Sequence, residues 1–182
     1  MIIVVETAAK KKSLHFYEFV KPIIDILDDA GVTFIVRHYT ELTKQDIEDA
    51  EKFIFCGNGL QDQKFLADSR KFAWLKTTSK PVLGICAGMQ MIGKVHGGRL
   101  KKKTHIGVSR LQFLEPDPLM NKMSKYDVYE LHNYAVSVPA GFAELAETDI
   151  PMAFRKRDTM MYGVLFHPEV MNKEFIRAFA LM

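Results

Sequence analysis

The chain carries the segment Pro81-Val82-Leu83-Gly84-Ile85-Cys86-Ala87-Gly88-Met89-Gln90. In it an apolar run leads into a Gly-x-Cys-x-Gly turn, and a helical pattern follows at once. This layout is typical of a nucleophile elbow with cysteine in place of serine. Glycines flank the nucleophile because a neighbouring Cβ would clash in so sharp a turn. The turn would place the sulfur of Cys86 beside the free N–H groups of a helix, which favour a thiolate.

A second segment supplies the proton shuttle that a thiolate nucleophile needs. Residues 160–166 are apolar and indicate a buried strand, and His167-Pro168-Glu169 follows directly. A histidine at one strand end can face a cysteine at a neighbouring strand end, and Glu169 can hold the imidazole in one tautomer. Triad partners meet in space rather than in sequence. We therefore predict a triad of Cys86, His167 and Glu169.

Each of these features has an ordinary explanation when it stands alone. A single cysteine in an apolar strand is usually a small buried hydrophobe, and His-x-Glu is usually surface polar sequence. Their order, and their positions at two strand ends, favour a catalytic cysteine instead.

The motifs Gly84–Gln90 and Gly163–Glu169 resemble those of the class I (triad-type) glutamine amidotransferases, in the same order and over nearly the whole chain. The resemblance implies that L-glutamine is the substrate and that its side-chain amide is hydrolysed through a thioester on Cys86. It also implies that His167 is the general base and then the acid, and that Glu169 orients it. Gln90 matches the family glutamine that helps to hold the substrate.

Two further stretches resemble the family's substrate pocket. The apolar run 52–56 ends in Gly57-Asn58-Gly59, where the family has Gly-Gly-Pro; by resemblance, N–H groups of Gly57, Asn58 and Ala87 form the oxyanion hole. The alternative is an ordinary strand-to-helix turn. Residues 130–136 resemble the family's histidine-containing loop and strand, so His132 either contacts substrate or simply finishes a strand.

Composition favours one core, and we expect a single glutamine amidotransferase domain over residues 1–182, with 48% hydrophobic and 26% charged residues. No apolar run approaches the roughly 18 residues of a membrane span, and the start lacks a signal peptide. A disulfide between Cys56 and Cys86 would disable the nucleophile, so a reducing cytoplasm is expected. Neither metal-ligand spacing nor a phosphate-binding glycine loop is present, so no metal or cofactor is expected.

The net charge of +3 is mild. Lys10-Lys11-Lys12 and Lys101-Lys102-Lys103 are the basic runs, and both are interpreted as solvated loops. Without interleaved aromatic residues they do not predict nucleic-acid binding. The sharper alternative for Lys101–Lys103 is a docking surface for a partner enzyme.

Alternating strands and helices up to Gly97 predict an α/β fold, with a mainly parallel open sheet flanked by helices as in flavodoxin-like proteins. Between Arg99 and Lys156 short alternating strands predict antiparallel additions. The expected strands cover residues 1–6, 32–36, 52–56, 81–85, 104–113, 127–131, 135–138, 143–147 and 160–166; the expected helices cover 16–27, a short helix capped by Thr43 and Asp46, 64–77 and 172–182. The site is expected at the carboxyl ends of the strands.

The fate of the ammonia is harder to predict. The chain has no room for an acceptor site, so the resemblance implies a partner synthetase. In size the chain resembles the separate glutaminase subunit of archaeal GMP synthetase, and the corresponding subunits of anthranilate and aminodeoxychorismate synthases are similar in length. The segment Thr7-Ala8-Ala9-Lys10 lacks the turn found in many family members. The alternatives are a stand-alone γ-glutamyl hydrolase and a non-catalytic regulatory subunit.

Overall fold

The computed structural model describes residues 1–11 and 13–182. Its strands are β1 (Ile2–Glu6), β2 (Phe34–His38), β3 (Lys52–Phe55), β4 (Val82–Ile85), β5 (Leu100–Arg110), β6 (Gln112–Phe113), β7 (Asp127–Val136), β8 (Phe142–Glu147), β9 (Pro151–Lys156) and β10 (Met161–Val164). Its helices are the π-helical turn η1 (Phe16–Val20), α1 (Lys21–Asp29), α2 (Lys44–Asp49), α3 (Lys64–Ala67), the 3₁₀ helix η2 (Ser69–Lys76), α4 (Ala87–Val95), the 3₁₀ turn η3 (Met120–Lys122), α5 (Pro168–Met171) and α6 (Lys173–Leu181). Within the described ranges, no helix has the length and apolar character needed to cross a bilayer.

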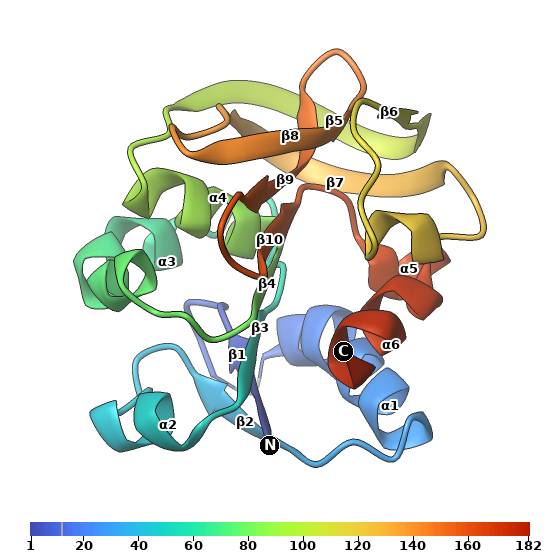
Figure 1. The fold of residues 1–182 in the computed structure, drawn as a ribbon. Helices are drawn as coiled ribbons and strands as arrows, with labels where there is room; N and C mark the ends of the chain where they lie inside the picture. Colours follow the sequence, from blue (N-terminus) through green and yellow to red (C-terminus); the bar gives the residue numbers. More distant parts are fainter. Residues whose placement is uncertain (12) are drawn as a thin grey trace.

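The main sheet has the order β2-β1-β3-β4-β10-β9-β8-β6. Its first five strands are parallel, and β9, β8 and β6 continue it in antiparallel pairing. Helices α1 and α6 cover one face of the parallel half, and α2, α3 and α4 lie on the other (Figure 1). Strands β1 and β4 are buried along their whole length, as expected of apolar strands inside a parallel sheet; only the last residue of β1, Glu6, is charged. The predicted fold class is confirmed, antiparallel additions included.

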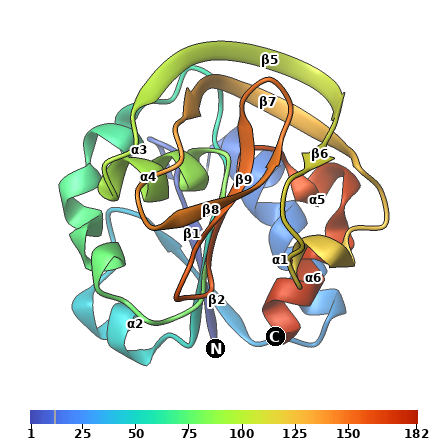
Figure 2. The ribbon, with the colours of Figure 1, turned by 45° about the horizontal axis from the view of Figure 1, so that its top comes forward.

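Strands β5 and β7 form a separate two-stranded ribbon. The ribbon arches over the carboxyl ends of the central strands (Figures 1 and 2). One edge of β7 pairs with β5, and carbonyl groups of β7 contact the residues that follow β4 and β10. The carbonyl of Tyr129 accepts a 2.8 Å hydrogen bond from the His167 N–H. The ribbon therefore forms one wall of the region where the sequence predicts the site.

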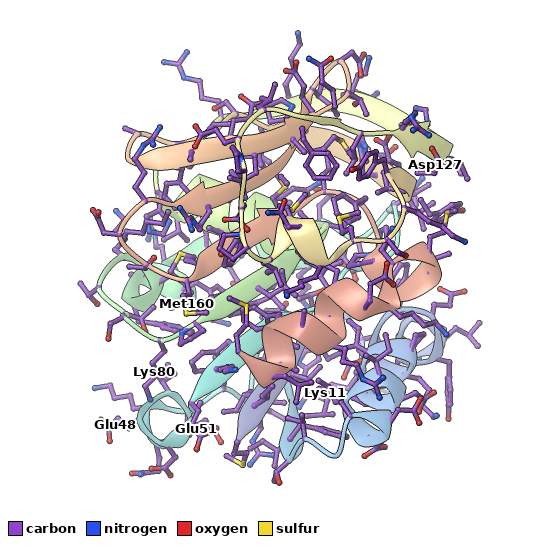
Figure 3. All side chains as sticks on the ribbon, turned by 45° about the vertical axis from the view of Figure 1, so that its right-hand side comes forward. Lys11, Glu48, Glu51, Lys80, Asp127 and Met160 are labelled. Atoms are coloured by element: carbon purple, nitrogen blue, oxygen red, sulfur yellow. The ribbon has the colours of Figure 1, made fainter. Side chains whose placement is uncertain are left out.

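The opposite end of the sheet is closed by polar contacts to carbonyl groups. The ammonium of Lys80, just before β4, donates to the carbonyl of Ile47 over 2.7 Å and also to that of Glu48. Lys80, Glu48 and Glu51 lie together at this end, far from Asp127 at the start of β7 (Figure 3). The two ends of the parallel strands thus differ. The amino end of β4 is held by the Lys80 hydrogen bonds, whereas the carboxyl ends lie under the ribbon.

The turn between β4 and α4 has the geometry of an elbow. Cys86 has φ 48° and ψ −101°, and among the described residues it alone, apart from glycines, has a positive φ. A Cβ on Gly84 would lie 2.5 Å from the backbone of Gly88, and one on Gly88 would lie 2.6 Å from the Phe55 carbonyl oxygen. Both glycines are needed because backbone, rather than a movable side chain, occupies the space.

The structure divides or joins several predicted elements differently. The helix expected over 64–77 is divided into α3 and η2 at Asp68, whose φ and ψ of −81° and 18° leave the helical range. The strands expected at 127–131 and 135–138 are joined in the single strand β7, which ends at Val136. It continues without a break because Glu130 and His132, which give this stretch a loop-like polarity, are buried and bonded to each other.

One of the two basic runs lies in a strand where a loop was expected, and one observed strand was not predicted. Lys101–Lys103 lie in β5 and not in a loop, because this strand alternates exposed and half-buried residues and needs few apolar ones. Lys10 and Lys11 are exposed in a loop, as predicted, while Lys12 lies outside the described residues. Strand β9, Pro151–Lys156, is absent from the predicted strands; it begins with proline, which is more typical of turns than of strands.

The Gly88→Ala substitution is expected to destabilise the protein by about 1–3 kcal/mol, because the new Cβ meets the Phe55 carbonyl. It should also change the rate at which iodoacetamide alkylates Cys86, since the elbow must shift. Gly97→Ala is the matched control: Gly97 follows α4 with φ +93° and open space around its Cβ. Gly97→Ala should destabilise the protein by about 1–2 kcal/mol, because alanine disfavours a positive φ, and Cys86 should be alkylated at the wild-type rate. Urea unfolding measures the loss of stability, and peptide mapping measures the alkylation of Cys86. Equal alkylation rates in the two variants would contradict the idea that Gly88 sets the position of Cys86.

Candidate active site

Three side chains predicted to form a triad come together where β4 and β10 end side by side. The two strands pair in parallel with Val164 opposite Ile85, so Cys86 and His167 leave the same edge of the sheet. Nδ1 of His167 lies 2.7 Å from a carboxylate oxygen of Glu169. Nε2 of His167 and Sγ of Cys86 lie 3.4 and 3.5 Å from one acceptor, the carbonyl oxygen of Leu131. The imidazole therefore bonds the carboxylate on one side and faces the cysteine region on the other.

The histidine of this group is held in a charged setting. Both ring nitrogens of His167 face acceptors, Glu169 and the Leu131 carbonyl, which suits an imidazolium. Burial lowers the pKa of His167, but the charges of Glu169 and Cys86 and their hydrogen bonds outweigh it and raise the pKa well above its ordinary value. A histidine of this kind can take and hold the proton of a neighbouring thiol.

Packing around the imidazole restricts its position. The ring of Phe19 lies against that of His167, with centroids 5.5 Å apart. On another side, a Cβ on Gly57 would lie only 2.5 Å from Cε1 of His167, so the glycine makes room for the ring. A cavity of about 230 Å³ opens beside His167 and Glu169, with Tyr129 and Leu131 in its wall.

A second, much smaller cavity of about 10 Å³ lies beside Cys86. Its walls come from the loop after β3, from α4 and from β7, and they include Asn58, Gln90 and His132 among the residues predicted for the site. The amide nitrogen of Gln90 donates to the carbonyl of Tyr134 over 2.7 Å. Four of the predicted site residues therefore border one space.

His132 lies in the middle of β7, so the interpretation that it finishes a strand is wrong. Its Nε2 is 2.8 Å from a carboxylate oxygen of Glu130, and its Nδ1 is 3.0 Å from the Lys103 carbonyl. Burial raises the pKa of Glu130, yet hydrogen bonds from His132 and Ser109, with the nearby histidine charges, lower it overall. Both ring nitrogens are thus engaged within the ribbon, and the side chain braces β7.

The residues predicted for the oxyanion hole lie on two sides of the elbow. Ala87 is the first residue of α4, where N–H groups have no partner within the helix. The loop after β3 is held by Thr7, whose hydroxyl lies 3.1 Å from the Cys56 carbonyl and 3.0 Å from that of Gly57. Asn58 Nδ2 donates to the Thr7 carbonyl over 3.4 Å. Thr7 belongs to the stretch that departs from the family pattern, and it anchors this loop.

Sequence reasoning missed several groups that shape the site. The carbonyls of Tyr129 and Leu131 act through the backbone, so no side-chain motif marks them. Phe19 falls within the helix expected over 16–27, and its sequence context gives no sign of a place beside the site. Cys56 is fully buried; burial first, then the charges of Glu169 and Glu6, raise the pKa of its thiol well above the ordinary value. Both cysteines are free thiols.

An elbow cysteine that faces a histidine–glutamate pair on an α/β sheet is the arrangement of a cysteine-nucleophile enzyme. The family model for class-I glutamine amidotransferases matches residues 14–180. The chain therefore belongs to the class I glutamine amidotransferase family, and it is an enzyme of that family.

Individual relatives agree with the family assignment. A glutamine-hydrolysing GMP synthase subunit of Archaeoglobus fulgidus is 31% identical over 156 residues, which cover 82% of each chain. The corresponding subunit of Sulfolobus acidocaldarius is 30% identical over 142 residues, 71% of this chain and 73% of that one. Among solved structures, a putative GMP synthase subunit from Thermoplasma acidophilum matches with a TM-score of 0.83 over 98% of this chain and 91% of that chain, at 18% identity.

The raised pKa of His167 predicts how stability depends on pH. The folded protein holds the imidazole proton more tightly than the unfolded chain, so the ion pair with Glu169 contributes fully below about pH 6.5, as long as Glu169 stays ionised, and is lost as the pH rises through the raised value. We compare the free energy of unfolding of Cys86→Ser with that of the double variant Cys86→Ser/His167→Gln. The single variant should be the more stable of the two, and the difference should decline as the pH rises above about 6.5. The serine background removes titration of the thiol. Denaturant unfolding from pH 6 to 9 measures this, and a difference that grows with pH would contradict the assignment.

Proposed function

We propose that this chain hydrolyses the side-chain amide of L-glutamine and delivers the ammonia to a partner synthetase. The observation that carries the proposal is the convergence of Cys86, His167 and Glu169 at the elbow. The family assignment supplies the reaction class, and the position of Gln90 beside Cys86 suits a residue that holds the substrate.

The chemistry follows from the positions of these groups. Sγ of Cys86 attacks the carboxamide carbon of glutamine while His167 accepts the thiol proton. His167 then donates that proton to the leaving nitrogen, so ammonia departs and a γ-glutamyl thioester remains on Cys86. Water, deprotonated by His167, attacks the thioester and releases glutamate and the thiol. Glu169 stabilises the imidazolium in both halves, and N–H groups of Ala87 and the Gly57–Asn58 loop stabilise the oxyanion, at about 3 kcal/mol each.

Docking of the partner is supported by apolar side chains around the cavity next to His167. Ile106, Val108 and Val170 are 58%, 60% and 53% exposed. In the ribbon, Ile106 lies opposite Leu131 and Val108 opposite Tyr129, and Val170 lines the cavity itself. Exposed apolar patches of this kind mark interaction surfaces. A partner bound here would cover the cavity beside His167 and Glu169.

We propose the synthetase of GMP synthesis as this partner. The support is that the relatives similar over most of both chains are named as glutamine-hydrolysing subunits of GMP synthase. Lys101–Lys103 lie on the same ribbon as the apolar residues, which fits a docking role for these lysines as well.

The Cys86→Ala substitution is expected to abolish glutamine-dependent ammonia release, because no other group can form the thioester. His167→Ala should lower the rate by about 10²–10⁴-fold, and Glu169→Gln should lower it less, since Glu169 acts only through His167. Cys56→Ala is the matched control and should keep the wild-type rate, as Cys56 is fully buried. A coupled glutamate assay checks all four; turnover near wild type in Cys86→Ala would refute the nucleophile assignment.

The partner is tested by adding the GMP synthase synthetase subunit of the same organism. We expect glutamine-dependent GMP formation that requires this chain, and a rise in glutaminase rate on mixing, because docking can complete the site. Ammonium salt in place of glutamine is the control that bypasses this chain. Full glutaminase activity without a partner would instead favour a stand-alone γ-glutamyl hydrolase, and no coupling to GMP formation would point to another synthetase.

A further inference from the structure

The cavity beside Cys86 is closed to glutamine. Its volume of about 10 Å³ is room for about one water molecule, and a glutamine side chain is much larger. If glutamine is the substrate, as proposed above, the walls of this cavity must part before the amide can reach Cys86. The contacts that join the walls therefore control entry.

One wall is the loop of residues 57–63, and the opposite wall is β7. The side-chain amide of Asn133 on β7 donates to the Leu60 carbonyl in that loop over 2.9 Å. The hydroxyl of Thr104 on β5 donates to Oδ1 of Asn133, also over 2.9 Å. Because both ends of the amide are bonded, its orientation is defined. We call Asn133, Leu60 and Thr104 the latch.

The remaining parts of the two walls have anchors of their own. Thr7 holds the loop at its Gly57 end, and Gln90 holds the Tyr134 end of β7. In β5 the pairing with β7 shifts register between Lys102 and His105, and such an irregularity re-aims side chains. Thr104 lies at that point. The latch thus joins the middle of the loop to the ribbon, between two regions that are fixed independently.

We propose that Asn133 gates the glutamine pocket. In the closed state its amide holds Leu60 against β7, and glutamine enters when this hydrogen bond opens and the middle of the loop moves away while Thr7 keeps its base in place. Loss of one neutral hydrogen bond shifts such an opening equilibrium by about three- to tenfold. Asn133 acts here on access and touches neither Cys86 nor His167 through its hydrogen bonds.

The test measures how fast iodoacetamide alkylates Cys86 in the intact protein, followed by peptide mapping. Asn133→Leu keeps the side-chain shape and removes the donor and acceptor, and Asn133→Ala also shortens it. Both should raise the rate about three- to tenfold. Thr104→Val keeps Asn133 and removes only the hydrogen bond that orients its amide, so the alkylation rate should rise less. This variant also provides the test if the Asn133 variants do not fold. Asn121→Leu, at an exposed asparagine away from the site, should match wild type.

Two internal readings separate gating from a loss of structure. Cys56 is fully buried and should stay unmodified in every variant, so its alkylation in step with Cys86 would mean general loosening and would overturn the proposal. The shape of the pH–rate profile for Cys86 should be unchanged, since the latch alters access and not the thiol. Wild-type rates in both Asn133→Leu and Thr104→Val would also overturn it.

The gate and the proposed function fail in different ways. Iodoacetamide needs no recognition of glutamine, so its rates test the latch whatever the substrate is. A chloroketone analogue of glutamine, used in parallel, tests glutamine recognition. Labelling of Cys86 that is faster in Asn133→Leu than in the wild-type protein, and absent from Cys86→Ala, supports both the gate and glutamine as its ligand. Faster iodoacetamide reaction with no labelling by the analogue in any variant would keep the gate and reject glutamine as its ligand.

Discussion

The backbone at Cys86 is the constraint on which the site depends. A non-glycine residue with φ 48° and ψ −101° is sparsely populated, and such a conformation costs about 1–3 kcal/mol unless its surroundings enforce it. Here the surroundings are rigid: the Cys86 N–H donates to the Val164 carbonyl over 2.8 Å, and α4 begins at the next residue. The close approach of Gly88 to Phe55 then brings α4 against the sheet. From this turn the sulfur of Cys86 reaches the carbonyl oxygen of Leu131 on β7, 3.5 Å away.

The remainder of the site is assembled by the free edge of β7. That edge meets no further strand among the described residues, and its carbonyls accept hydrogen bonds from the candidate site. The Tyr129 carbonyl accepts from the His167 N–H, and the Leu131 carbonyl accepts from the Cys86 thiol and the His167 ring. A buried pair, Glu130 and His132, alternates with these residues along the strand, and Nδ1 of His132 ties it to the Lys103 carbonyl of β5. One strand thus braces itself through Glu130 and His132 and offers the carbonyls of Tyr129 and Leu131 to the candidate site, while His132 also borders the cavity beside Cys86.

Parts of this arrangement follow from sequence because they are local or geometric. Cys86 and His167 each follow an apolar strand, and parallel strands bring their carboxyl ends to one edge, so their proximity could be predicted. The capping box of Thr43 and Asp46 could also be predicted, since it needs only two residues at a spacing of three in the sequence. The break at Asp68 could not be read, because helical periodicity continues across it. Nor could the role of the Leu131 carbonyl or the contact of Asn133 with Leu60, which depend on where the ribbon crosses the sheet.

The separateness of the β5–β7 ribbon has a consequence for how the molecule opens. Proteins unfold locally in cooperative units, and a two-stranded ribbon outside the main sheet is a natural unit of lower stability. Cys86 and His167 follow strands of the main sheet, whereas the Leu131 carbonyl that both contact belongs to the ribbon. Partial unfolding of the ribbon would therefore disperse the geometry of the candidate site while the hydrophobic core stayed intact. Amide hydrogen exchange in β7, more than the melting temperature, would report how long the site stays assembled.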